Sequence, residues 1–212
     1  MKTYLYIADT EQLKDGALFK RLYELLPEYR KEKIDRLKIE NDKRLSLAAG
    51  ILLKTALEEN GILSGGAEIA FGERGKPFIP GREDIRFNLS HSGTKALCII
   101  SEHEVGCDVE RLREYNSSLA SYICSQKQFE AIEALPEAER AEAFTQLWTM
   151  KESYMKATGK GIGIRASSVD FPIKNYKIFS YDPVDGHCIS CCIDQSAADK
   201  PELKEIDLRK TP

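Results

Sequence analysis

The chain is organised around Trp148-Thr149-Met150-Lys151-Glu152-Ser153-Tyr154-Met155-Lys156. Read as a helix at about 100° per residue, it has an apolar face that carries Phe144, Leu147, Trp148 and Met155. Glu152 and Lys156 lie four residues apart at the edge of that face, so their charged ends can meet. Lys151 falls inside the apolar face, and a buried ammonium group needs an acidic partner because an unpaired one is costly or loses its proton. We expect Asp108 and Glu110 to supply the acidic groups beside this helix.

The two acidic residues lie in Val105-Gly106-Cys107-Asp108-Val109-Glu110, a segment that alternates as a β-strand does. The alternation sends the apolar side chains to one face, and Gly106, Asp108 and Glu110 to the other. Two carboxylates on one face repel each other unless a cation or a lysine lies between them. A solvent-facing strand also tolerates acidic residues, but Gly106 favours the close approach of another group.

Length and composition indicate an ordinary globular protein. The 212 residues are 42% hydrophobic and 31% charged, which is enough for one large domain or two small ones. The formal net charge of -3 gives no general attraction to nucleic acid or to an anionic membrane. Residues 1–9 are too short and too soon interrupted for a signal peptide, and no apolar run approaches the roughly 18 residues of a membrane span. We therefore expect a cytoplasmic protein without nucleic-acid or membrane partners.

Six cysteines stand at positions 98, 107, 124, 188, 191 and 192. Several lie inside apolar runs, where cysteine behaves as a small buried hydrophobic residue. Cys188 and Cys191 have the spacing of a zinc ligand pair, but the sequence has no second pair to complete the site. Reduced and buried cysteines are therefore favoured over a metal site.

The periodicity predicts helices followed by strands, twice along the chain. The first set is a strand over 3–7, helices over 11–26, 28–38 and 42–59, and short strands between 69 and 101. The second set is a strand over 104–110, helices over 116–123, 127–135 and 137–158, and strands over 176–181, 187–193 and 203–208. We expect 95–101 and 104–110 to form a hairpin, and the last three strands to belong to a second sheet. This order predicts an α+β protein with two lobes, residues 1–102 and residues 103–212.

Charged groups from distant parts of the chain fit one site. If the strand of Asp108 and Glu110 packs beside the helix of Glu152 and Lys156, three carboxylates converge. Oxygen ligands without His or Cys suit Mg²⁺ or Mn²⁺ rather than zinc, and Mg²⁺ takes further ligands from substrate phosphates. Basic residues that would hold a ligand with several phosphate groups are Arg30, Lys33, Arg44, Lys76, His91 and Lys156. Chemistry alone supports metal-assisted phosphoryl transfer or hydrolysis and does not decide between them.

Four motifs, in order along the chain, resemble the phosphopantetheinyl transferase family. They are Gly75-Lys76-Pro77, Phe87-Asn88-Leu89-Ser90-His91-Ser92, the strand 105–110 and the helix 148–156. The resemblance covers most of the chain. It is strongest to the long, two-lobed type that activates nonribosomal peptide synthetases such as surfactin synthetase (the Sfp type). It implies an α+β fold of two similar α/β lobes related by a pseudo-two-fold axis, with the active site in the cleft between them.

The resemblance also implies an activity and a role for each site residue. The enzyme would be Mg²⁺-dependent and would move 4′-phosphopantetheine from coenzyme A to a serine of an apo acyl or peptidyl carrier protein, releasing 3′,5′-ADP. Asp108, Glu110 and Glu152 would share Mg²⁺, or Mn²⁺ in its place, with the pyrophosphate. Lys156 would neutralise the pyrophosphate as charge develops on the leaving group. Glu152 would also be the candidate general base, directly or through water, and its role as ligand, base or both is left open. The phosphorylated ribose would be held by Lys76, Ser90, His91 and Arg44, and the adenosine end by Arg30 and Lys33.

Two other functions use the same residues. A metal-dependent phosphohydrolase acting on coenzyme A or nucleotides would have water as its nucleophile, and a non-catalytic module would bind without transfer. Three converging carboxylates argue against the module. The sequence does not identify the carrier protein. The sequence leaves two possibilities open for four apolar residues, which either form a docking patch for the carrier or are buried in the core: Leu119, Ala120, Tyr122 and Ile123. Two lobes in one chain predict a monomer.

Overall fold

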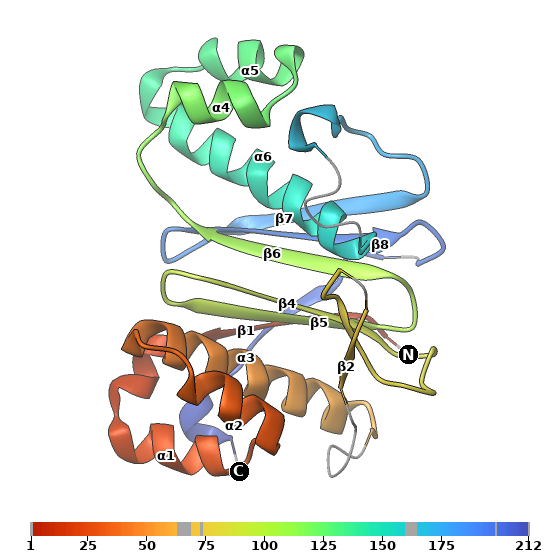
Figure 1. Cartoon of the computed structure of the whole chain (residues 1–212). Coiled ribbons are helices and arrows are strands. Elements are labelled where there is room, and N and C mark those ends of the chain that lie inside the picture. Colours follow the sequence, from red (N-terminus) through yellow and green to blue (C-terminus); the bar gives the residue numbers. More distant parts are fainter. Residues whose placement is uncertain (1, 63–68, 73, 160–164, 198, 212) are drawn as a thin grey trace.

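Two β-sheets packed face to face form the centre of the structure, and helices cover both outer faces (Figure 1). The computed structural model describes residues 2–62, 69–72, 74–159, 165–197 and 199–211. Within these ranges the chain mixes α and β elements, as the sequence predicts.

The first sheet has the strand order β4-β5-β1-β9. Its strands are β1 (Tyr4–Asp9), β4 (Arg86–Ser92), β5 (Lys95–Ser101) and β9 (Glu202–Glu205). β5 lies between β4 and β1, is antiparallel to both, and is buried along its whole length. Its continuous apolar run suits a strand that is covered on both faces. β4 and β5 are joined by a tight turn in which Gly93 has a φ of 58°, a left-handed conformation that glycine adopts without strain.

The second sheet has the order β6-β8-β7, and its neighbouring strands are antiparallel. Its strands are β6 (Val105–Arg111), β7 (Tyr176–Val184) and β8 (His187–Asp194). Val105, Cys107 and Val109 of β6 share a buried apolar core with Leu5 and Ile99 of the first sheet. The predicted alternation along β6 is therefore confirmed, and its apolar face packs sheet against sheet.

The first sheet is covered by α1 (Gly16–Glu24), α2 (Glu28–Asp35) and α3 (Glu40–Glu59), which lie on its outer face (Figure 1). α3 contributes more buried residues to this core than any other element: Leu47, Ile51 and Leu52 are fully buried with Phe87. A short ribbon of β2 (Ala70–Phe71) and β3 (Pro77–Phe78) stands apart from both large sheets.

The second sheet is covered by α6 (Glu137–Ala157), with α4 (Ser117–Ile123) and α5 (Gln126–Glu133) outside it (Figure 1). Thr149 and Ser153 are fully buried, and Thr149 Oγ1 lies 2.8 Å from Ser190 Oγ of β8. α6 therefore meets the sheet with small and polar side chains, and the predicted apolar face does not anchor it there.

The apolar face of α6 has another partner. Phe144 and Leu147 pack on Cys124 and Ile132, in the small core formed with α4 and α5. α6 ends before Gly159, whose φ of 63° is the glycine stop that the sequence predicts.

The predicted hairpin of β5 and β6 is wrong. β5 is already paired on both edges, to β4 and to β1, so no edge is free for β6. The chain instead crosses at residues 102–104 to the second sheet, where β6 pairs with β8.

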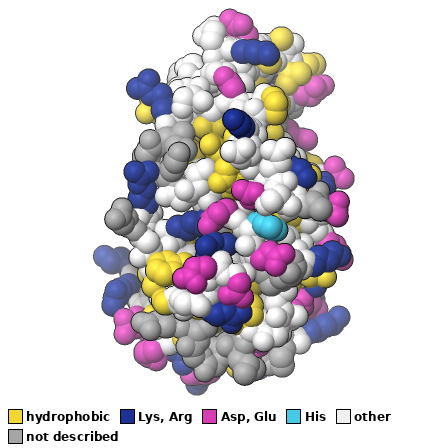
Figure 2. Space-filling model, turned by 90° about the vertical axis from the view of Figure 1, so that its right-hand side faces the viewer, with side chains coloured by type: hydrophobic (Ala, Val, Ile, Leu, Met, Phe, Trp, Pro, Cys, Tyr) yellow, Lys and Arg dark blue, Asp and Glu magenta, His cyan; other side chains and the backbone are white. Residues whose placement is uncertain are grey.

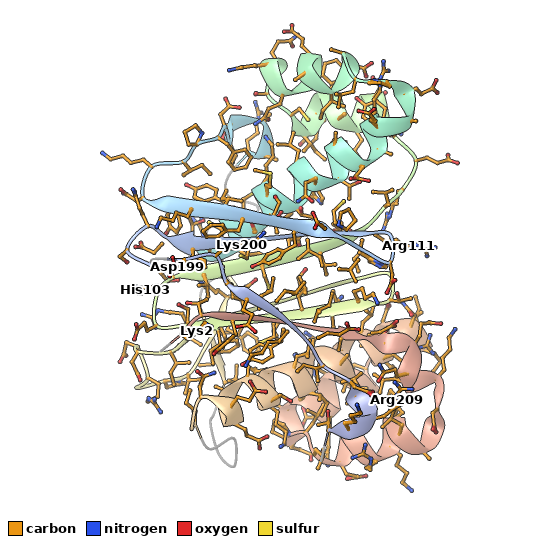
Figure 3. All side chains as sticks on the ribbon, turned by 180° about the vertical axis from the view of Figure 1, so that it is seen from behind. Lys2, His103, Arg111, Asp199, Lys200 and Arg209 are labelled. Atoms are coloured by element: carbon orange, nitrogen blue, oxygen red, sulfur yellow. The ribbon has the colours of Figure 1, made fainter. Side chains whose placement is uncertain are left out.

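The last predicted strand belongs to the first sheet and not to the second. Residues 202–205 pair in parallel with residues 4–7 of β1, and Leu208 enters the core under α1 and α3. Figure 3 shows this final segment from behind, running from Lys200 beside the second sheet to Arg209 beside the first helices. The division into residues 1–102 and 103–212 stays a prediction, and the end of the second range is joined to the first sheet.

One face of the molecule mixes both signs of charge (Figure 2). On the face shown in Figure 2, Lys and Arg side chains alternate with Asp and Glu side chains, and hydrophobic side chains form small groups between them. The helices of the described ranges include none that is long and apolar enough to cross a membrane. All six cysteines are free and buried.

Candidate active site

Close packing of α6 on β6 brings the acidic strand and the basic helix together. A Cβ atom at Gly106 would overlap the backbone oxygen of Ser153 and the backbone nitrogen of Ala157. Gly106 therefore allows the approach of a helix backbone, which is the role that its place in the strand indicates. Two residues further along β6, Asp108 meets the side chain of Lys156.

Asp108 is almost fully buried, with 2% of its surface exposed. Its Oδ1 accepts a hydrogen bond from Ser90 Oγ at 2.8 Å and forms an ion pair with Lys156 Nζ at 2.5 Å. Lys156 also donates to Ser90 Oγ at 2.9 Å. One residue each from β4, β6 and α6 thus forms a closed set of contacts. The second oxygen, Oδ2, is buried without a hydrogen-bond partner among the described residues.

Glu110 is held in the same way two residues further along both strands. Ser92 Oγ donates to Glu110 Oε2 at 2.8 Å and accepts the backbone N–H of Arg111 at 3.2 Å. Ser90 Oγ accepts the backbone N–H of Val109 at 3.4 Å. In both backbone contacts the residue of β6 lies 19 positions after the serine of β4, so β4 and β6 run parallel where the two sheets meet. Side-chain oxygens of β4 here accept the N–H groups that backbone carbonyls accept within a sheet.

The three carboxylates of the predicted metal set influence one another. Glu152 is partly buried on α6, one turn before Lys156. Burial and the negative charges of Asp108 and Glu110 raise the pKa of Glu152, while Lys156 opposes the shift. Burial also raises the pKa of Asp108, again against the attraction of Lys156. One ammonium group therefore does not fully compensate the negative charge at this point.

This donor set suits a hard divalent cation. Its donors are carboxylate oxygens, and Asp108 Oδ2 is the kind of orphaned buried acceptor that a cation would satisfy. Within the described ranges, however, no three Asp, Glu, His or Cys side chains are arranged closely enough to hold a metal ion. The assignment of Asp108, Glu110 and Glu152 as ligands therefore stays a prediction.

A cavity of about 370 Å³ lies next to the carboxylates, between α2, α3, the ribbon of β2 and β3, β4 and the end of α6. We call it the basic pocket. Six residues predicted to hold a phosphorylated ligand line it: Arg30, Lys33, Lys76, Ser90, His91 and Lys156. Arg44 does not line it. Its guanidinium group donates to Asn41 at 3.3 Å, and its Nε is buried without a partner among the described residues.

Arg30 and Lys33 carry positive charge that no carboxylate of the described residues neutralises. Arg30 is 6% exposed, and its Nε has no hydrogen-bond partner there. Burial lowers the pKa of Arg30. The side chain of Lys33 is exposed, and partial loss of hydration together with the charge of Arg30 lowers its pKa. Loss of hydration and the charges of Lys156, Lys33 and Arg30 lower the pKa of His91. An anion in the basic pocket would relieve this repulsion.

Lys76 lies at the edge of the basic pocket and already has partners. Its Nζ forms an ion pair with Glu104 Oε2 at 2.5 Å and donates to the carbonyl oxygen of Ala157 at 2.6 Å, at the end of α6. Arg86 pairs with the other oxygen of Glu104 at 2.8 Å. Two cations share one carboxylate, so positive charge remains here as well.

Lys151 does not meet the carboxylates of β6, and the expectation that they serve it is wrong. It is fully buried, and its Nζ donates to the carbonyl oxygens of Ala166 at 2.7 Å and Val169 at 2.9 Å. Lys156 lies five helical steps after Lys151, which turns their side chains about 140° apart. Only Lys156 therefore faces β6.

Beyond His91 lies a shallower and mostly polar hollow of about 630 Å³. His91 lines both this hollow and the basic pocket, and Glu110 and Ser92 line the hollow. Arg111 and Arg113 line it as well. The carboxylates of β6 thus lie between two depressions of the surface.

Of the four residues that could form a docking patch or lie in the core, two are exposed and two are buried. Leu119 and Tyr122 of α4 are exposed, Tyr122 by 77%. Ala120 and Ile123 are buried.

Sequence reasoning missed the role of Ser92 at this site. The available signal is the spacing of Asn88, Ser90 and Ser92, which puts three polar side chains on one face of β4. Of these three residues, only Ser90 is given a role by the family resemblance. In the structure the same face meets the edge of β6, where Asn88 Oδ1 accepts the backbone N–H of Cys107 at 3.1 Å.

Comparison with known proteins finds similar proteins that cover most of the chain. The family model described as the 4′-phosphopantetheinyl transferase superfamily matches residues 104–192, which contain β6 and α6. A 4′-phosphopantetheinyl transferase of Bacillus subtilis is 30% identical over 159 residues, covering 74% of this chain and 71% of that protein. AcpT of Salmonella typhimurium is 35% identical over 149 residues, covering 69% and 74%. Sfp of Bacillus subtilis strain 168 is 28% identical over 160 residues, covering 74% and 71%.

The chain belongs to the 4′-phosphopantetheinyl transferase superfamily. The resemblance seen in the four sequence motifs is thereby confirmed. These relatives are named transferases, and they give no support to the phosphohydrolase alternative.

Proposed function

We propose that this protein transfers 4′-phosphopantetheine from coenzyme A to a serine of an apo acyl or peptidyl carrier protein and releases 3′,5′-ADP. The observation that carries the proposal is the basic pocket. Arg30 and Lys33 line it without an acidic partner among the described residues, and it adjoins the carboxylates of Asp108 and Glu110. Coenzyme A matches this arrangement because it has a phosphorylated ribose and, at a distance from it, a pyrophosphate.

Coenzyme A would place its nucleotide end in the basic pocket. Arg30 and Lys33 would contact the adenosine end, and Lys76, Ser90 and His91 would contact the phosphorylated ribose. Arg44 has less support for the same role because it does not line the pocket. The pyrophosphate would then reach Lys156, which lines the pocket and touches Asp108.

Mg²⁺, or Mn²⁺ in its place, would be held by Asp108, Glu110 and Glu152. When bound, a divalent cation of this kind neutralises charge on the pyrophosphate. Asp108 Oδ2 is the oxygen best placed for it, because Oδ1 is engaged by Ser90 and Lys156.

Two side chains would act on the reacting groups. The carrier serine hydroxyl attacks the β-phosphate, and Glu152 accepts its proton directly or through water. The raised pKa of Glu152 suits this, since a base works best when its pKa lies nearer the working pH. Lys156 stabilises the negative charge that develops on the departing 3′,5′-ADP, and its own pKa is raised by Asp108 despite burial.

The proposal extends to the arrangement of the whole chain. Two similar α/β lobes, residues 1–102 and 103–212, would be related by a pseudo-two-fold axis with the active site in the cleft between them. α3 on the first sheet and α6 on the second would be counterparts. One chain then contains a complete site, which supports a monomer. The proposed place of action is the cytoplasm, and the proposed partner is a carrier protein.

The direct test is mass spectrometry of apo carrier proteins after incubation with coenzyme A, Mg²⁺ and this protein. We expect one carrier serine to gain the mass of one phosphopantetheine group, EDTA to stop the reaction and added Mg²⁺ to restore it. Asp108→Ala and Glu152→Ala should each abolish the transfer with the fold intact. Release of 3′,5′-ADP without any carrier would instead indicate a hydrolase, and near-normal turnover in either variant would overturn the proposed metal set.

The place of the ribose phosphate can be tested separately. Lys76→Ala should weaken binding of coenzyme A far more than binding of dephospho-coenzyme A, measured by calorimetry. Arg86→Ala is the matched control, because Arg86 pairs with the same Glu104 but does not line the basic pocket. It should weaken neither ligand. Equal losses for both ligands in Lys76→Ala would place the 3′-phosphate elsewhere.

A further inference from the structure

Ser92 contacts a proposed metal ligand without belonging to the basic pocket. It is 9% exposed, and its Oγ lies 2.8 Å from Glu110 Oε2. Ser90 lines the basic pocket, whereas Ser92 is absent from its lining. The roles proposed above for coenzyme A therefore leave the hydroxyl group of Ser92 without a function.

The direction of the Ser92 hydrogen bond is fixed by its surroundings. The backbone N–H of Arg111 donates to Ser92 Oγ at 3.2 Å and occupies an acceptor position on that oxygen. A serine hydroxyl has a single hydrogen, and an ionised carboxylate can only accept. The hydrogen must therefore point at Glu110 Oε2, which gives a charge-assisted bond of the stronger kind.

The neighbouring pair repeats this arrangement. Ser90 Oγ receives the N–H of Val109 and an N–H of Lys156, so its hydrogen points at Asp108 Oδ1. Each carboxylate thus has one oxygen held by a serine of β4. The other oxygens, Asp108 Oδ2 and Glu110 Oε1, receive no hydrogen bond from the described residues. The pairs Ser90–Asp108 and Ser92–Glu110 therefore have the same arrangement, two residues apart along β4 and β6.

We propose that Ser92 is a positioning residue for the divalent cation, acting through Glu110. By holding Oε2, it fixes the plane of the carboxylate and leaves Oε1 to bind the ion that Glu110 would share with Asp108 and Glu152. This inference rests on the proposed function, since it takes Glu110 to be a metal ligand. Removing a residue that orients a metal ligand typically reduces metal affinity or activity by about 10- to 100-fold.

The competing explanation is purely structural, since Ser92 also joins β4 to β6. Ser101 offers a matched control because it makes the same two kinds of contact at a buried site. Its Oγ accepts the backbone N–H of His103 at 3.1 Å and lies 2.8 Å from the Oγ1 of Thr3. Its partner is a hydroxyl instead of a carboxylate, so Ser101→Ala reports the loss of a buried serine alone.

The experiment measures Mn²⁺ affinity by electron paramagnetic resonance of free Mn²⁺, in the presence of saturating coenzyme A, together with thermal unfolding. Ser92→Ala should bind Mn²⁺ about 10-fold more weakly than wild type or worse. Ser92→Thr keeps the hydroxyl on a residue type that strands accept, and should restore most of the affinity. Ser101→Ala should lose stability and keep wild-type Mn²⁺ affinity. If Ser92→Ala does not fold, the near-isosteric Ser92→Cys, with a weak donor, gives the same comparison.

The outcomes separate this inference from the function on which it rests. If wild type binds Mn²⁺ and Asp108→Ala does not, the proposed metal set stands, and equal affinity in Ser92→Ala and wild type then overturns the role of Ser92. Equal loss of affinity in Ser92→Ala and Ser101→Ala overturns it too, because the effect would be general destabilisation. If wild type binds no Mn²⁺ even with coenzyme A present, the proposed metal set itself fails.

Discussion

Lys151 and Lys156 lie five residues apart on one helix and end in different surroundings. The ammonium group of Lys151 is closed in by the carbonyl oxygens of Ala166 and Val169. That of Lys156 touches a carboxylate and a hydroxyl at the edge of the basic pocket. A lysine that ends on backbone carbonyls ties a loop to a helix. One that ends on a carboxylate beside a pocket can contact a ligand while it keeps that carboxylate in place.

Electrostatics separates the two lysines in the same way. Burial lowers the pKa of Lys151, and the charge of Asp170 opposes this shift only in part. Among the described residues, its ammonium group contacts backbone carbonyls and forms no ion pair. Burial acts on Lys156 in the same direction, but the charge of Asp108 and the hydrogen bond to it raise the pKa of Lys156 above its ordinary value. α6 therefore serves the fold through one lysine and the site through the other.

The largest expected effect is on catalysis in Lys156→Met. Removing one preorganised group that stabilises developing charge reduces kcat by about 10²- to 10³-fold, and we expect at least this loss in carrier modification. Lys151→Met is the matched control and should transfer normally per folded molecule. If the two variants lost the same activity at equal folded concentration, the distinction between the lysines would fail.

A second and smaller effect is expected on stability in Lys151→Met. The carbonyl oxygens of Ala166 and Val169 would lose their donor, and an unsatisfied buried acceptor costs about 1–3 kcal/mol. Removal of a buried charge offsets part of this, so we expect a net loss of about 2 kcal/mol in the free energy of unfolding, measured with urea. Unchanged stability combined with lost transfer would give Lys151 the role assigned to Lys156.

The seating of α6 on β6 can be disturbed without touching either lysine. Gly106→Ala would push the backbone of Ser153 and Ala157 away from the strand, and such overpacking costs about 1–3 kcal/mol. The displacement should also separate Lys156 from Asp108 and weaken coenzyme A binding in calorimetry. Gly16→Ala is the control, because a Cβ there meets no atom within 4 Å. If Gly106→Ala kept the stability and the coenzyme A affinity of the wild type, the contact between α6 and β6 at Gly106 would not position the site.

The smallest expected effect is an opposite dependence on alkaline pH. Lys151 has a folded pKa below 10.5, so the unfolded chain binds more protons there, and this lysine adds stability as pH rises towards 10.5. Lys156 has a folded pKa above 10.5, so its contribution is lost as pH rises beyond that value. Differences in unfolding free energy between wild type and each Lys→Met variant should therefore slope in opposite directions, by less than about 1.4 kcal/mol per pH unit. Parallel slopes would contradict the assigned surroundings.

The sequence predicts local features well because they depend on residues near one another. Alternation along residues 105–110 puts Asp108 and Glu110 on one face, and Gly106 indicates a close approach. The helix of Lys156 and its glycine stop follow from periodicity and from Gly159.

What the sequence leaves undecided depends on contacts between distant segments. Whether β5 pairs with β6 depends on which strands already occupy its edges, and β1 and β4 do. Residues 202–205 return to β1, and their pattern does not say which sheet has a free edge. Lys151 donates to two backbone carbonyl oxygens. Every residue has such an oxygen, so the sequence does not indicate which ones a lysine will contact.

A crystal structure with coenzyme A and Mn²⁺, with the ion located by its anomalous scattering, would test the proposed site directly. We predict one Mn²⁺ bound by Asp108, Glu110 and Glu152, with the phosphates of coenzyme A against Lys156 and in the basic pocket, and with Lys151 still on the carbonyls of Ala166 and Val169. An ion bound away from these three carboxylates, or a nucleotide outside the basic pocket, would contradict it.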